Sequence, residues 1–149
     1  MDYETIYNKF LSKIDDPKLL SYEDYVLYEI LEDYLTSTLA IPYVRKLFKT
    51  ISLNENLEIF TYTLNVNIDD YSDTAFILEV LAKGMVIQWM TQKIDTSLSL
   101  ATMVGGKEEK MLRNEYRANK ERLRELNVEL KKFIRDSNYI DNSYIKEGL

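Results

Sequence analysis

The chain has 149 residues, 46% of them hydrophobic, which suits one globular domain with a sizeable core. It contains no cysteine and no histidine, which excludes disulfides, thiolate nucleophiles, the usual zinc ligands and the commonest general base. The formal net charge of −6 disfavours sequence-independent binding to nucleic acid, because a polyphosphate is repelled by an acidic protein.

The charges are unevenly distributed along the chain. Residues 1–75 contain 6 lysines and arginines against 14 acidic residues, whereas residues 76–149 contain 13 against 11. One half is therefore acidic and the other mildly basic. The acidic start (MDYETIYNKF) is unlike a secretory signal, and the most apolar stretch, Gly84 to Gln92, is far shorter than the roughly 18 residues of a membrane span. We expect a soluble protein that does not enter a membrane.

Two helices are predicted in the first third of the chain. Apolar residues recur at helical spacing over about 2–14, and Asp15-Asp16-Pro17 follows as a stop signal. The second helix is predicted over 21–40, because Ser21-Tyr-Glu-Asp24 has the pattern of a capping box and Pro42 follows its end.

Residues 43–71 lose the helical period, and their alternation of apolar residues with Thr and Asn predicts a short hairpin or an ordered loop. The acids that follow, at 69, 70 and 73, are expected to stabilise the positive end of the next helix. A calcium loop is a poor alternative, because Asp70 and Phe76 stand where that loop needs its glycine and its last glutamate.

A helix over 73–94 is apolar around most of its circumference, which predicts burial on several sides. A Ser/Thr-rich connector is expected over 95–106, followed by a long charged helix over 107–136. Its apolar residues fall on alternating steps of four and three, with Asn119 in the one polar place. This heptad seam is either the core face of a bundle helix or a coiled-coil surface for a partner, in which a single Asn fixes the register.

The sequence thus predicts an all-α fold of about four helices in a small bundle, with an irregular or β-hairpin insertion at about 43–71. The helical domain is expected over 1–136 and an extended C-terminal tail over 137–149. Much of the core is expected to consist of Val80, Leu81, Val86, Ile87, Trp89, Leu123, Leu126 and Leu130.

No catalytic, cofactor or metal site is predicted. Gly105-Gly106-Lys107 fails the phosphate-loop pattern, because Ala101 and Glu108 stand where Gly and Ser or Thr are required. Adjacent acids such as Glu32 and Asp33 point about 100° apart around a helix. They therefore cannot act together on one substrate as a general acid and a general base. The tail repeats a Tyr-Ile pair in a polar context. It is either a disordered chain end or a binding segment, because Tyr is a preferred residue of binding hot spots. On the second interpretation its anchors are Tyr139, Ile140, Tyr144 and Ile145.

The order of these elements resembles the head-tail adaptor, or head-completion, proteins of tailed bacteriophages. The similarity covers nearly the whole chain and is clearest in ILEVLAKGMVIQWM, GGKEEK and RLRELNVELKKFIRD. The resemblance implies a structural virion protein of the neck, assembled in the host cytoplasm, and not an enzyme. Such proteins form rings, usually of twelve copies, that dock on the portal protein after DNA packaging and receive the next neck or tail protein. Genomic DNA would pass through the lumen without specific binding.

On this reading the tail anchors dock on the portal, and neighbouring copies meet through unlike charges. The expected basic contact residues are Arg113, Arg117, Lys120, Arg124 and Lys131. The expected acidic contact residues are Glu23, Asp24, Glu32 and Asp33. The alternative function is a helical regulatory or scaffolding protein that binds a single partner through its heptad helix.

Overall fold

A computed structural model of the chain describes residues 1–140. The N-terminal part forms α1 (Tyr3–Leu11), α2 (Pro17–Leu20), α3 (Asp24–Ala40) and the short α4 (Pro42–Arg45). The two predicted helices are therefore present, but each is shorter than expected.

The predicted capping box at Ser21 is wrong. Asp16 caps α2 instead, accepting a hydrogen bond from the amide of Leu19 at 3.2 Å. The Ser21 hydroxyl donates to the Lys18 carbonyl at 2.6 Å, so Ser21 belongs to the end of α2. Helix α3 begins only at Asp24, with no side chain capping its N-terminus.

A two-stranded antiparallel hairpin follows, formed by β1 (Phe48–Asn54) and β2 (Ile59–Leu64) with Asn54 opposite Ile59. The hairpin confirms one of the two alternatives for residues 43–71, and the fold is mostly helical and not strictly all-α. Residues at the start of the chain extend the pairing, because the Phe60 amide donates to the Met1 carbonyl at 2.8 Å and the Tyr3 amide donates to the Glu58 carbonyl at 2.9 Å.

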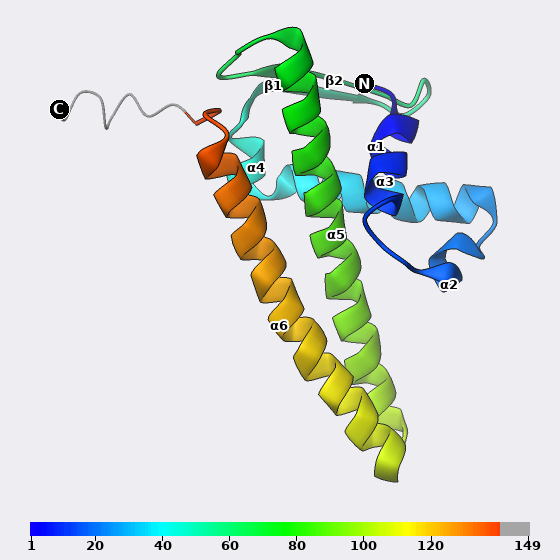
Figure 1. Cartoon of the computed structure of the whole chain (residues 1–149). Helices are drawn as coiled ribbons and strands as arrows, with labels where there is room; N and C mark the ends of the chain where they lie inside the picture. Colours follow the sequence, from blue (N-terminus) through cyan, green and yellow to red (C-terminus); the bar gives the residue numbers. More distant parts are fainter. Residues whose placement is uncertain (141–149) are drawn as a thin grey trace, which may run out of the picture.

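Two long helices, α5 (Asp70–Met103) and α6 (Gly106–Asp136), complete the described residues. They lie side by side as an antiparallel pair that extends well beyond α1 to α4 (Figure 1). The expected connector over 95–106 is wrong, since only Val104 and Gly105 separate the helices. Packing explains the difference: Ser97 and Ala101 are buried, and this burial outweighs the weak helix propensity of the Ser/Thr-rich stretch.

The start of α5 confirms the expected role of the acids before it. The Asp69 side chain occupies the N-cap position and accepts a hydrogen bond from the Ser72 amide at 2.7 Å. This hydrogen bond from the Ser72 amide lowers the pKa of Asp69. A hydrogen bond from the Ser72 hydroxyl lowers it further.

Helix α5 is the centre of the core, packed by α1, α3 and α6. Five of the eight predicted core residues are buried, whereas Trp89, Leu123 and Leu126 are only partly buried against the core. Trp89 lies at the edge because its indole N–H donates to the Asp16 carboxylate at 2.8 Å and the Lys93 ammonium lies 4.5 Å from the ring centre.

By length and composition alone, α5 could cross a membrane, which the short uncharged stretch in the sequence did not indicate. However, 56% of its most apolar window is buried inside the fold. Packing by the neighbouring helices accounts for this apolar surface, as it does in the core helices of soluble proteins.

Candidate functional site

The heptad seam of α6 packs on α5 of the same chain. Leu130 is fully buried, and Leu123, Leu126 and Phe133 pack against the same core. This part of the seam is therefore the core face of a bundle helix.

The five basic positions predicted for a subunit contact form one stripe along α6. Their spacing of four, three, four and seven residues keeps them on one side of the helix, about 100° around from the seam. All five are exposed. Four of them also line a shallow groove with Leu123 and Val128, and Val128 is 59% exposed. We call Arg113, Arg117, Lys120, Arg124 and Lys131 the basic stripe.

Most of the basic stripe has no acidic partner within the part of the chain that the structure describes. Arg113 pairs with Glu109 at 3.0 Å, one turn earlier in α6. The other four have no carboxylate within 4.0 Å among residues 1–140. Lys120 lies over the Tyr116 ring, and Lys131 over the Tyr43 ring, at 5.7 and 5.4 Å from the ring centres. These cations remain available to an acidic partner.

The four predicted acidic positions do not share one face. Glu23 and Asp24 are exposed at the N-terminal end of α3. Glu32 faces the turn of the hairpin, where Glu55 and Glu58 lie near it, whereas Asp33 lines a groove between α3 and α5.

The hairpin turn adds two acids that the sequence did not indicate. Burial raises the pKa of Glu32, and so does repulsion from Glu55, Asp33 and Glu58. Glu55 and Glu58 are 23 and 26 positions away in the chain, so no local pattern relates them to Glu32; only the hairpin brings them together. We call Glu32, Glu55 and Glu58 the acidic cluster.

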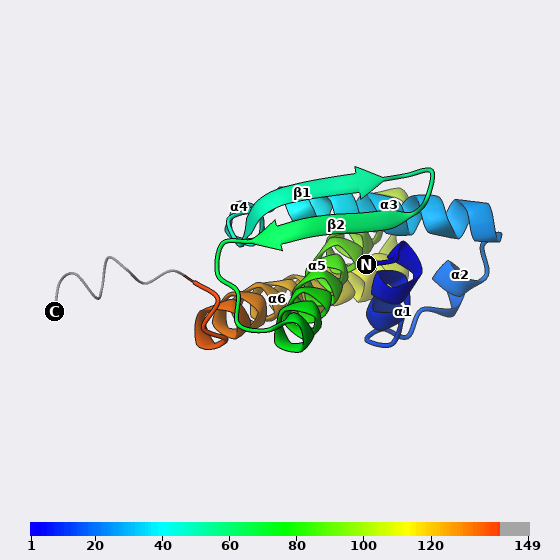
Figure 2. The ribbon, with the colours of Figure 1, turned by 90° about the horizontal axis from the view of Figure 1, so that it is seen from above.

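The helix that carries the basic stripe lies at the opposite edge of the molecule from the elements that carry Glu23, Asp24 and the acidic cluster. Helix α6 forms one edge, on the left in Figure 1, and the N-terminal half of α3 projects from the other edge beside α2. The view from above keeps this separation, with the hairpin turn on the same side as the N-terminal half of α3 (Figure 2). We call the edge formed by α6 the basic flank, and the edge that carries Glu23, Asp24 and the acidic cluster the acidic flank.

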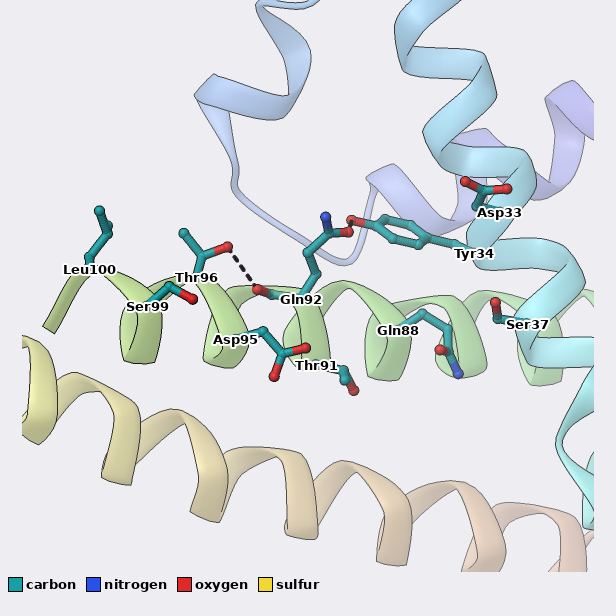
Figure 3. Close-up of a pocket in the computed structure, with 10 residues that line it drawn as sticks. All are labelled: Asp33, Tyr34, Ser37, Gln88, Thr91, Gln92, Asp95, Thr96, Ser99 and Leu100. Atoms are coloured by element: carbon teal, nitrogen blue, oxygen red, sulfur yellow. Dashed lines mark hydrogen bonds between the residues drawn. The ribbon is translucent and has the colours of Figure 1, made fainter. Parts of the chain in front are cut away.

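A polar groove between α3 and α5 is the third surface (Figure 3). The Tyr34 hydroxyl donates to the side-chain oxygen of Gln92 at 3.1 Å, and the Thr96 hydroxyl donates to the Gln92 carbonyl at 3.0 Å. Burial raises the pKa of Tyr34, so its hydroxyl stays protonated. With the carboxylates of Asp33 and Asp95 also lining it, the groove can accept hydrogen bonds and cations.

No group of three or more acidic side chains is placed to hold a metal ion within residues 1–140. The polar groove offers carboxylates, amides and hydroxyls, and its tyrosine and threonine hydroxyls are engaged by the protein itself. These carboxylates and amides suit hydrogen bonding to a polar surface of another protein.

The predicted tail anchors divide between the body and the chain beyond it. Tyr139 is 6% exposed, stacks on Phe76 with ring centres 4.0 Å apart, and donates to the Asp73 carboxylate at 2.8 Å. Ile140 is 41% exposed. Tyr144 and Ile145 lie outside the described residues. The packed body therefore includes Tyr139, beyond the expected domain end at residue 136.

Comparisons with models of protein families, with curated proteins and with solved structures gave no match.

Proposed function

We propose that this chain is a structural subunit of a bacteriophage neck. Its copies pack side by side in a ring, expected to hold twelve, that docks on the portal after DNA packaging and receives the next neck or tail protein. The contact between copies joins the basic stripe of one subunit to the acidic flank of the next. No catalytic step is involved, and the net charge of −6 suits a lumen through which DNA passes without binding.

The observation that carries this proposal is the placement of unlike charges on opposite flanks. A head-to-tail contact between two different surfaces generates a ring when the rotation between copies closes. Burial raises the pKa of Glu32, and repulsion from Glu55, Asp33 and Glu58 raises it further; cations of a neighbour would relieve that repulsion. The basic stripe supplies such cations. Val128, which lines the same groove, adds an exposed apolar side chain to this surface.

A charge exchange between the flanks tests the contact. In one variant Arg117→Glu and Arg124→Glu place two carboxylates in the middle of the basic stripe, and in the other Glu55→Lys and Glu58→Lys place two ammonium groups in the acidic cluster. Each variant alone should fail to assemble, because like charges would meet at every contact. Mixed in equal amounts, the two should assemble with alternating subunits. The measurement is sedimentation velocity of each variant and of the mixture.

The matched control is Lys107→Glu with Lys132→Glu, which changes the net charge of α6 equally but lies about 100° around the helix from the stripe. This control should assemble like the unmodified chain. Assembly by either flank variant alone, or no assembly in the mixture when the unmodified chain does assemble, would remove the charged flanks from the mechanism.

Attachment to the portal is expected to use Ile140 with Tyr144 and Ile145, with Tyr139 holding the base of this segment on the body. A chain that stops after Ile140 keeps the whole described core, so it should remain folded while losing its binding to portal-bearing capsids. Co-sedimentation of full-length and shortened chains with such capsids measures this, and equal binding by both would exclude the segment from docking.

A further inference from the structure

A groove of about 710 Å³ lies where α4, the start of β1 and the end of α6 meet. Its apolar lining includes Leu47, Ile134 and Tyr139, all buried, and Ile140, which is 41% exposed. This volume falls in the range of sites that hold a ligand or several side chains. We call it the C-terminal groove.

The C-terminal groove has a cationic rim. Lys46, Lys131 and Arg135 line it, and only Arg135 has an acidic partner among residues 1–140, at 3.2 Å from Asp136. An occupant with apolar side chains and carboxylates would satisfy both parts of this lining.

Tyr43, one of the residues that line the groove, carries an unsatisfied polar group. The Tyr43 hydroxyl is buried and has no hydrogen-bond partner within the described residues. Burial raises the pKa of Tyr43, so the group remains a hydroxyl that can donate. Buried polar groups nearly always have a partner, so an occupant whose acceptor reached this hydroxyl would gain a hydrogen bond.

The chain itself offers an occupant of the right chemistry. Residues 141–149 (DNSYIKEGL) follow directly after Ile140, which lines the groove. They carry the apolar pair Tyr144-Ile145, the carboxylates of Asp141 and Glu147, and one cation, Lys146. Tyr144 is four residues beyond Ile140, a reach of up to roughly 14 Å, so the segment can return to the groove. Covalent attachment at the rim also gives it a high effective concentration there.

We propose that residues 141–149 bind in the C-terminal groove of their own chain, with Tyr144 and Ile145 on its apolar lining and the carboxylates near Lys46 and Lys131. This inference does not depend on the phage-neck function. If that function holds as well, the groove keeps the portal-docking residues covered until the portal displaces them.

Cysteine cross-linking in the full-length chain tests the proposal. The sequence has no native cysteine, so only the two introduced thiols can form a disulfide. Lys46→Cys on the rim is combined with Ser143→Cys beside the anchors, and oxidation is followed by mass spectrometry under non-reducing conditions. The control pair is Asn8→Cys with Ser143→Cys, since Asn8 is exposed on α1, outside the groove lining. Thermal unfolding of each variant establishes that it is folded.

The expected result is an intramolecular disulfide that forms at least about tenfold faster in the groove pair than in the control pair, as a local concentration effect requires. Adding Tyr144→Ser and Ile145→Ser should abolish this advantage, and Lys131→Glu should reduce it. Equal rates in the two pairs would overturn the proposal. Disulfide-linked dimers in place of the intramolecular product would also overturn it, because the segment would then occupy the groove of another copy.

Discussion

At the scale of single residues, a few polar contacts tie distant parts of the chain to the core. The Asp73 carboxylate accepts from the Tyr139 hydroxyl at 2.8 Å and from the Ile68 amide at 3.0 Å, which joins the chain beyond α6 to the segment before α5. The Asp16 carboxylate accepts from the Trp89 indole and from the Leu19 amide. These bonds join the connection between α1 and α3 to α5. Hydrogen bonds to charged groups are among the stronger ones in proteins, so these contacts fix the ends of otherwise short elements.

Tyr139 should therefore contribute to folding stability. Shortening the chain after Asp136 removes a buried ring, and we expect the free energy of unfolding to fall by about 3 to 5 kcal/mol. Tyr139→Phe, which keeps the ring and removes its hydrogen bond to a carboxylate, should cost about 1.5 to 3 kcal/mol. A chain ending at Ile140 is the control: it keeps Tyr139 and lacks only the segment proposed to bind in the C-terminal groove, so its loss in urea unfolding should be clearly smaller than that of the chain ending at Asp136. Equal stability of all three would mean that Tyr139 is not packed in solution.

Glu32 should destabilise the single subunit at neutral pH. Its pKa is raised in the folded state by burial and by repulsion from neighbouring acids, so its contribution to stability is present below the unfolded pKa and is lost as pH rises through the folded one. Glu32→Gln should thus raise the free energy of unfolding at pH 7 by a few tenths to about 1 kcal/mol. The gain should vanish below about pH 4, where the carboxyl is protonated in both states.

Urea unfolding at several pH values measures this effect. The control is Glu115→Gln, which removes one negative charge at an exposed position of α6 away from the acidic cluster. A gain that grows as pH falls would contradict the assigned direction of the pKa shift.

At the scale of elements, the crossing of α3 and α5 depends on two small residues. Gly84 on α5 meets the side chain of Thr38 on α3 so closely that a β-carbon at residue 84 would overlap the Thr38 methyl group. Thr38 is fully buried, and its hydroxyl donates to the Tyr34 carbonyl at 2.7 Å. The two helices can approach this closely only because residue 84 lacks a side chain.

Gly84→Ala should accordingly destabilise the protein, although alanine is favoured over glycine by up to about 1 kcal/mol in helices. We expect a loss of about 1 to 3 kcal/mol from overpacking. In a Thr38→Ser background, which removes the methyl group and keeps the hydroxyl, most of this loss should disappear. Urea unfolding of the four proteins in this cycle gives the coupling energy, and a value near zero would show that the helices do not meet at this point.

The elements also show how far the sequence alone could predict this fold. The seam of α6, the apolar α5 and the acids before it were all predicted, because helical periodicity and end signals are local properties. Residues 95–106 were predicted as a connector, because their Ser and Thr content argues against a helix when packing on α6 is not known. Ser21 was assigned to the wrong helix because a second N-cap, Asp16, lies five residues earlier.

The candidate sites could be predicted only in part, for a related reason. The basic stripe lies on one helix, so its spacing in the sequence determines its common face. The acidic cluster joins α3 to the hairpin turn, and the C-terminal groove joins α4 and β1 to α6; both depend on contacts between distant residues. Likewise, the position of Tyr139 on Phe76 is set by the end of α6 returning to the start of α5.

At the scale of the whole molecule, charge placement should govern assembly. The contact joins exposed cations to exposed acids, and such pairs are screened over about 8 Å at physiological ionic strength and about 3 Å at 1 M salt. Assembly should weaken steadily as salt rises from about 0.05 to 0.5 M, as sedimentation velocity would show. The stability of the single subunit should change much less, because its core is apolar. Assembly that is indifferent to salt would point to an apolar interface elsewhere.

The most direct test of the proposed ring is electron microscopy of the purified full-length chain at low salt and high concentration. We expect closed rings in which α6 of each copy faces the N-terminal half of α3 and the hairpin turn of the next copy. Dimers related by a two-fold axis with the same surface in contact on both copies, or single subunits at every concentration both alone and with the portal present, would contradict the proposed function.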